Sequence, residues 1–103
     1  MMPLPYCVYV LFSRKDHLLY IGFSTNLSNR IVKHNSGGNT STAFRTPLDL
    51  IFCEFYLFKQ DALKRKKYFK TNMGKKALKL MLNRTLVKLG YKGQVMKYEY
   101  LDE

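Results

Sequence analysis

The chain has 103 residues, nearly half of them apolar, so it can bury one modest core but not a second domain of ordinary size. Its 18 lysines and arginines, against 7 aspartates and glutamates, give a formal charge of +11 and make a polyanion the expected partner. We expect no membrane attachment, because no apolar run approaches the length of a transmembrane helix, and the sequence makes no stable protein partner evident.

The N-terminus and the cysteines indicate a cytoplasmic protein. Residues 1–5, Met-Met-Pro-Leu-Pro, lack the basic and apolar regions of a signal peptide. Cys7 and Cys53 fall inside predicted strands, with no His or Cys at metal-ligand spacing. Both are therefore expected to be reduced residues of the core.

A β-hairpin is predicted at the start of the chain. Residues 6–12 are dense in β-branched and aromatic side chains, as in a buried strand. Residues 13–17 are polar enough for a hairpin loop, and residues 18–23 return as a second strand.

The register of this hairpin decides whether two tyrosines are neighbours. Because side chains alternate across a sheet, Tyr9 and Tyr20 share a face only if odd positions pair with even ones. Leu11 opposite Leu18 is an example of such pairing. Gly22 would then let a backbone or ligand approach beside Tyr20, although a bulge would require a glycine equally well.

A helix is predicted from Leu27 to Asn35, and Thr25 or Asn26 can accept a hydrogen bond from its first amides. At about 100° per residue, four side chains share one arc toward the apolar side; these are Arg30, His34, Leu27 and Ile31. A helix that needed only solubility would turn an arginine and a histidine outward, so this one is predicted to aim two phosphate-compatible groups at the sheet. The alternative is an edge-of-core histidine beside a snorkelling arginine.

A polar loop and a third strand follow this helix. In residues 36–42, the hydroxyls of Ser41 and Thr42 suit phosphate contacts, and they suit any surface loop equally. Arg45 lies just before the third strand, which is predicted at about residues 48–55 and is expected to be mostly buried.

The next helix, at about residues 61–70, places a charge on its apolar face. On the helical wheel, Lys66 falls between Phe69 and Ala62. Burying an unpaired ammonium is costly, so position 66 is expected to open into a cleft or to meet an anion.

A third helix is predicted at about residues 75–89, with Gly90 as its stop. Its apolar stripe consists of Leu78, Met81, Leu82, Leu86 and Leu89. The predicted architecture is one α/β domain over residues 1–90, with a small three-stranded central sheet flanked by helices in the order β-β-α-β-α-α. Residues 91–103 are expected to add an edge strand or to form a docked tail.

The chain resembles the GIY-YIG nuclease family, specifically its small single-domain members. Val8-Tyr9-Val10 stands at the first signature of the family, and Tyr20-Ile21-Gly22 is the second signature intact. The likeness covers most of residues 6–82, and it continues in order through Asn26-Leu27, Arg30, His34-Asn35, Ser41-Thr42, Arg45-Thr46-Pro47, Leu50-Ile51, Asp61-Ala62 and Lys70-Thr71…Gly74. Tyr-Ile-Gly alone is not specific, whereas this ordered set is.

The resemblance implies a GIY-YIG-like fold and an endonuclease that hydrolyses phosphodiester bonds in nucleic acid, with DNA as the expected substrate. It implies that Tyr9 acts with His34 to deprotonate water, that Tyr20 positions water and phosphate, and that Arg30 stabilises developing charge. A basic cleft lined by Arg30 would be needed to make a phenolate accessible. The residues expected to contact nucleic acid are Lys33, Asn35, Ser41, Thr42, Arg45, Lys66 and Lys70.

One residue departs from the family pattern. Most members carry a metal-binding glutamate where this chain has Lys66, within Arg65-Lys66-Lys67. The family implies Mg²⁺ or Mn²⁺, but an ammonium cannot ligate a cation, so this metal is in doubt and no ligand is assigned. Glu54 is considered as a substitute ligand.

Three classes of function therefore stay open. The retained Tyr9, Tyr20, Arg30 and His34 favour a phosphodiesterase with an altered metal site. Lys66 favours a nuclease-derived, non-cleaving nucleic-acid-binding module. A basic protein-interaction domain would be favoured only by a closed cleft.

Overall fold

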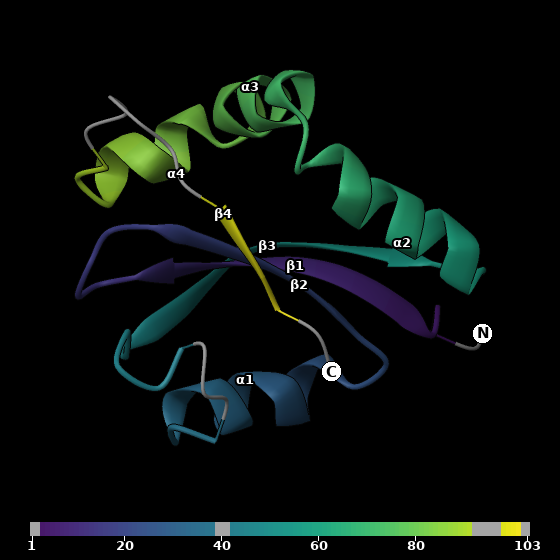
Figure 1. The fold of residues 1–103 in the computed structure, drawn as a ribbon, viewed down its shortest axis with the longest axis horizontal. Coiled ribbons are helices and arrows are strands. Elements are labelled where there is room, and N and C mark those ends of the chain that lie inside the picture. The colour runs from purple at the N-terminus through teal and green to yellow at the C-terminus, as the bar shows by residue number, and fades with distance from the viewer. Residues whose placement is uncertain (1–2, 39–41, 92–97, 102–103) are drawn as a thin grey trace.

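The structure is built around its first strand, which has another strand on each edge and helices over both faces (Figure 1). The computed structural model describes residues 3–38, 42–91 and 98–101. In chain order the elements are β1 (Tyr6–Ser13), β2 (Leu19–Ser24), α1 (Leu27–Asn35), β3 (Leu48–Tyr56), α2 (Lys59–Tyr68), α3 (Asn72–Met81), α4 (Asn83–Lys88) and β4 (Tyr98–Leu101).

The sheet has the order β3-β1-β2-β4. Strand β1 pairs antiparallel with β2 and β3, which confirms the predicted three-stranded centre of an α/β fold. Strand β4 pairs in parallel with β2, so residues 98–101 form an edge strand, one of the two alternatives for the tail. Residues 92–97 and 102–103 lie outside the described residues.

The hairpin register pairs odd with even positions, so Tyr9 and Tyr20 lie on the same face of the sheet, as predicted for this register. Tyr9 is opposite Gly22, and Leu11 is opposite Tyr20. The example of Leu11 opposite Leu18 was wrong by two residues, because Leu18 belongs to the turn, where its carbonyl accepts from the Ser13 amide at 3.1 Å.

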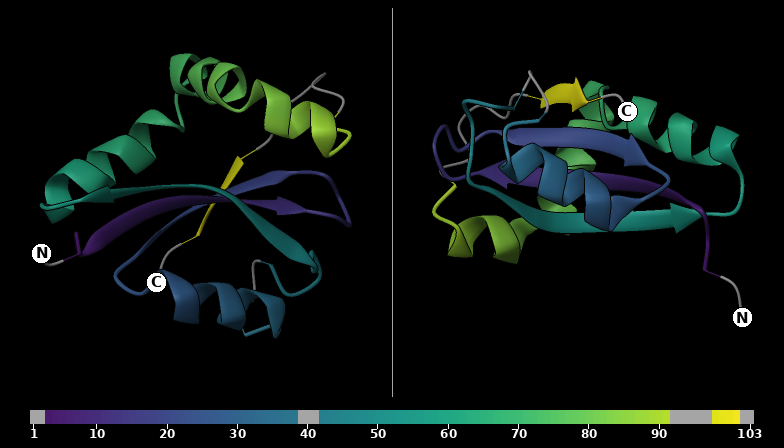
Figure 2. Two further views of the ribbon diagram at one scale, coloured as in Figure 1. Left: turned by 180° about the vertical axis from the view of Figure 1, so that it is seen from behind. Right: turned by 90° about the horizontal axis from the view of Figure 1, so that it is seen from below.

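Different helices cover the two faces of the sheet (Figure 2), and each face buries its own core. Helix α1 covers the face that carries Cys7, Tyr9, Leu11, Tyr20 and Leu48. Helices α2, α3 and α4 lie over the other face, whose core also contains Val8, Val10, Phe12, Leu19, Ile21, Phe23, Ala62, Phe69, Leu78, Leu82 and Leu86. The tyrosines and α2 therefore belong to opposite layers.

Strand β3 is less buried than its hydrophobic run predicted. Within it, Leu50 and Phe55 are 41% and 46% exposed. Cys53 is also exposed, so its assignment to the core was wrong, whereas Cys7 is buried as expected. The reason is topological, since β3 is an edge of the sheet.

The third predicted helix is two helices. Helix α3 ends and α4 begins at Leu82, whose φ of −106° and ψ of 19° are not helical. No Gly or Pro marks the break, and Leu78, Leu82 and Leu86 stay buried across it. Met81, predicted in the stripe, is instead 47% exposed.

Gly90 ends α4 as predicted. It has a φ of +75°, and its amide donates to the Val87 carbonyl while that of Tyr91 donates to Leu86. In the part of the chain that is described, no helix combines the length and apolarity needed to cross a membrane.

Candidate active site

Tyr9 and His34 meet between the sheet and α1. The Tyr9 hydroxyl is 3.0 Å from Nε2 of His34, and the two residues are 1% and 0% exposed. Helix α1 begins where the Asn26 side chain accepts a hydrogen bond from the Asn29 amide, as predicted, and this fixes the arc that carries His34. The sequence therefore folds so that a strand phenol and a helix imidazole share a buried hydrogen bond.

The imidazole of His34 is held neutral. Burial, reinforced by the charges of Arg30 and Lys33, lowers the pKa of His34 to about 4. Its Nδ1 is 2.7 Å from Oγ1 of Thr42, a residue that is itself fully buried. A neutral ring has one N–H and one bare nitrogen, so His34 donates to one of the two hydroxyls and accepts from the other.

Gly22 has a defined role beside this pair. It lies opposite Tyr9 in the ladder, and a Cβ at position 22 would overlap the Tyr9 ring and hydroxyl. The Tyr9 side chain therefore fills the space at Gly22, where a backbone or a ligand was predicted to approach.

Tyr20 belongs to a second network. Its hydroxyl donates to Oδ2 of Asp16 at 2.6 Å and accepts from Nε of Arg45 at 2.9 Å. Arg45 also pairs with Asp16 at 3.0 Å. Burial first, and then the bond to Asp16, raise the pKa of Tyr20 above its ordinary value, so its phenol stays protonated.

One turn supports both networks. The Arg45 amide donates to the Thr42 carbonyl at 2.9 Å, so the side chains that contact His34 and Tyr20 belong to the same turn. Asp16 was absent from the predicted site, and nothing in its local sequence distinguishes it from an ordinary turn residue. Its partner Arg45 comes from a distant loop.

A small polar pocket of about 280 Å³ opens at the start of α1. It is lined by Ser24, Thr25, Asn26, Asn29, Arg30 and Lys33. The first turn of α1 has no acidic residue, so the helix N-terminus adds to the positive field of Arg30 and Lys33. This pocket has the charge and hydrogen-bonding groups that suit a phosphate.

The comparison with known proteins identifies the family. Residues 5–79 match the GIY-YIG catalytic domain. The chain belongs to the GIY-YIG family. It is 41% identical over 68 residues to a UPF0213 protein of Staphylococcus saprophyticus, which covers 65% of this chain and 83% of that protein. It is 34% identical over 89 residues to a UPF0213 protein of Clostridium perfringens, covering 85% and 95% respectively. No solved structure gives a significant match.

The residue at the family glutamate position lies in the other layer. Lys66 is 9% exposed in α2, so the predicted apolar position is confirmed. However, α2 packs on the sheet face opposite Tyr9 and His34 (Figure 1). Lys66 therefore does not lie on the face that carries Tyr9 and His34, and its predicted contact with phosphate stays a prediction.

The described donors around this GIY-YIG site do not by themselves form a site for a divalent cation. Among the described side chains, three carboxylates, those of Asp16, Asp49 and Glu54, are each paired with an arginine. Glu54 accepts from Arg65 at 2.8 Å on the α2 side, which argues against it as the substitute ligand. No group of three or more His, Cys, Asp or Glu that could hold a metal occurs in the described part of the chain.

The other predicted nucleic-acid contacts have different surroundings. Lys33 and Lys70 are exposed, as phosphate partners must be. The Asn35 side chain accepts from the Leu48 amide at 2.8 Å and donates to its carbonyl at 3.0 Å, which joins α1 to β3. Ser41 lies outside the described residues.

Proposed function

We propose that this chain is a GIY-YIG endonuclease that binds DNA by its phosphates at the start of α1 and hydrolyses phosphodiester bonds beside Tyr9. The observation that carries the proposal is the 3.0 Å contact between Tyr9 and His34, on the helix that also carries Arg30. In this proposal Tyr9 and His34 handle the proton, and Arg30 stabilises the charge on phosphate.

The reaction requires a bare Nε2 on His34, with Nδ1–H donating to Thr42. Water attacks phosphorus, its proton passes to the Tyr9 oxygen, and the Tyr9 proton passes to Nε2. The P–O bond to the leaving nucleotide breaks, that oxygen takes a proton from solvent, and His34 releases the proton on Nε2 to solvent, which restores the neutral ring. Burial first, and then the charges of Arg30 and Lys33, oppose a charged His34; a bound phosphate offsets those two charges and makes the proton transfer easier.

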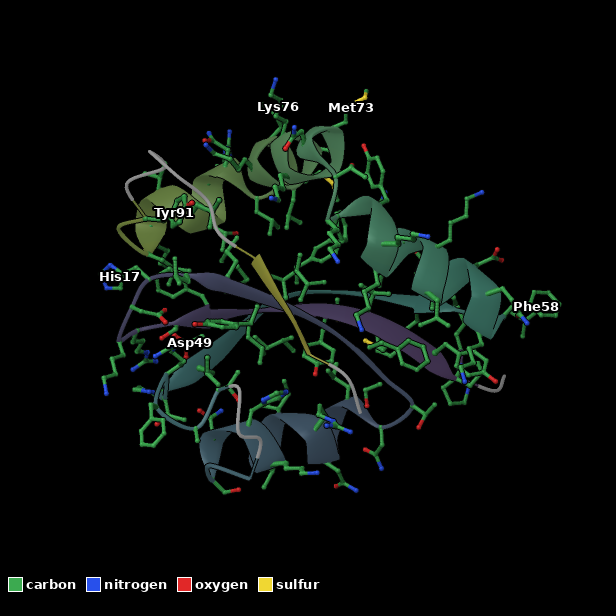
Figure 3. The ribbon with its side chains drawn as sticks, viewed as in Figure 1. His17, Asp49, Phe58, Met73, Lys76 and Tyr91 are labelled. Atoms are coloured by element: carbon green, nitrogen blue, oxygen red, sulfur yellow. The ribbon has the colours of Figure 1, made fainter. Side chains whose placement is uncertain are left out.

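Arg30→Ala should lower cleavage at least about 100-fold, because it removes a charge that stabilises the transition state. Its melting temperature should stay near that of the native protein, since Arg30 is only partly buried. The assay uses duplex and branched DNA with Mg²⁺, Mn²⁺ or a chelator. The control is Lys76→Ala, whose side chain points away from the sheet on α3 (Figure 3).

Two results would contradict this assignment. Loss of stability in Arg30→Ala comparable to that of a core truncation would make Arg30 structural. Unchanged cleavage would remove it from the reaction. If a chelator stops cleavage, a ligand outside the donors described above holds the metal.

A second candidate is a GIY-YIG-derived module that binds nucleic acid without cleaving it. It is favoured by Lys66 in place of the glutamate and by the burial of Tyr9, which keeps its hydroxyl from bulk water. Binding without cleavage under every metal condition would select this candidate over the first.

A further inference from the structure

A second pocket lies on the α2 side of the sheet, in the layer opposite Tyr9 and His34. It has a volume of about 390 Å³, within the range of ligand-binding pockets. It is lined by Tyr56, Asp61, Lys64, Arg65 and Tyr68, from the end of β3 and from α2. None of these residues belongs to the site proposed above.

The wall of this pocket is held in place by Arg65. Its Nε donates to Oε1 of Glu54 at 2.8 Å, and Nη2 is 3.4 Å from Oε2. The guanidinium carbon is 4.5 Å from the ring centre of Phe69 and 5.4 Å from that of Tyr68. The N–H groups of Arg65 bind Glu54 and its guanidinium plane lies near two aromatic rings, so the pocket wall is ordered before any ligand binds.

The chemistry of the lining indicates a flat ring with a polar edge and an attached anion. Tyr56 and Tyr68 offer aromatic surface, and Tyr68 is 36% exposed. Asp61 can accept from an amino group or a ring N–H, and Lys64 can contact a phosphate. An aliphatic side chain would use the rings but neither the carboxylate nor the cation.

We propose that this pocket takes one unpaired nucleobase of a bound nucleic-acid strand, stacked on Tyr68, with Lys64 on the adjoining phosphate. A paired base inside a duplex has both faces covered by its neighbours, so the pocket selects single-stranded segments. The inference rests on the proposed function only in taking nucleic acid as the partner; it does not require hydrolysis.

The test compares two fluorescently labelled DNA strands of equal length by anisotropy: one with ordinary bases, the other with abasic sites throughout. Both carry the same phosphates. Tyr68→Ala should weaken binding of the ordinary strand by roughly tenfold or more, because a stacking surface is lost. It should leave the abasic strand unaffected. Tyr68→Phe, which keeps the ring, should bind both strands as the native protein does.

Two further variants separate stacking from charge and from general loss of surface. Phe58→Ala removes a 61% exposed ring at the start of α2, outside the pocket lining, and should change neither affinity (Figure 3). Lys64→Gln should weaken the binding of both strands equally. It should also reduce the slope of log affinity against log salt concentration by about one.

The outcomes distinguish the two proposals. If the native protein binds neither strand but does bind duplex DNA at low salt, only the pocket assignment fails; if it binds no DNA of any kind, the nucleic-acid partner is wrong and both proposals fail. If it binds and Tyr68→Ala lowers both affinities equally, or neither, only the pocket assignment is overturned. If a thermal melt shows that Tyr68→Ala is unfolded, Tyr68→Leu gives the same comparison with the apolar bulk kept.

Discussion

At the scale of single residues, the site consists of two tyrosines with opposite surroundings. Tyr9 faces a neutral imidazole, whereas Tyr20 faces a carboxylate and a guanidinium. The wheel of α1 predicted that His34 faces the sheet, because that follows from local periodicity alone. The Asp16 and Arg45 contacts were beyond prediction, since they depend on how two distant loops meet.

The burial of His34 predicts a pH-dependent stability. The pKa of His34 in the folded protein, about 4, lies below the ordinary histidine pKa of 6.5, so below pH 6.5 the unfolded chain binds a proton that the folded ring does not. The contribution of His34 to the free energy of unfolding should therefore be fully present above pH 6.5. It should fall by up to about 3 kcal/mol between pH 7 and pH 4. Urea unfolding at a series of pH values measures it.

His34→Gln should remove this part of the pH dependence. His17→Gln, which changes the exposed histidine of the hairpin loop, is the matched control and should retain the native dependence (Figure 3). If His34→Gln and the native protein lose stability in parallel as the pH falls, other groups are responsible.

At the scale of elements, the sequence predicted the features that depend on neighbouring residues, such as helix caps and apolar arcs. Helix α1 has the predicted bounds because its cap and its apolar arc are both local. The break at Leu82 was missed because one long helix and two shorter helices bury the same leucines, so the apolar pattern does not distinguish them. The exposure of β3 was missed because a hydrophobic run does not say whether its strand is central or at an edge.

The hairpin supplies a prediction about Gly22. Gly22→Ala should destabilise the fold by about 1–3 kcal/mol, because the new methyl group overlaps the Tyr9 ring opposite it. In a Tyr9→Leu background the same substitution should cost little, and the difference is the coupling of the two positions. Chemical denaturation of all four proteins closes the cycle, and additive costs would show that the two residues do not collide.

At the scale of the whole molecule, charge and layering have separate consequences. The +11 charge belongs to the chain and was plain from composition. The layer that contains Lys66 could not be predicted from the sequence. A helical wheel shows which face of α2 is buried but not which face of the sheet it packs against. The family match supports the nuclease fold, while the pairing of the carboxylates was found only in three dimensions.

The net charge predicts how binding responds to salt. Affinity for DNA should fall by orders of magnitude between about 50 and 200 mM salt if six or more phosphates are contacted, because each contact releases condensed counterions. Titrations at several salt concentrations give the slope. Tight binding that salt does not change would contradict a phosphate-dominated interface.

The central position of β1 has a kinetic consequence for the proposed hydrolysis. Amides of a strand paired on both edges and covered on both faces exchange with solvent only when the domain unfolds globally. Helix α1 covers one face, and the Asn35 side chain bonds it to β3, so a partial opening that separates α1 from an intact β1 has to break these two bonds. This partial opening would expose the Tyr9 hydroxyl without loss of the fold. Its equilibrium constant, set in part by Asn35, would then limit turnover.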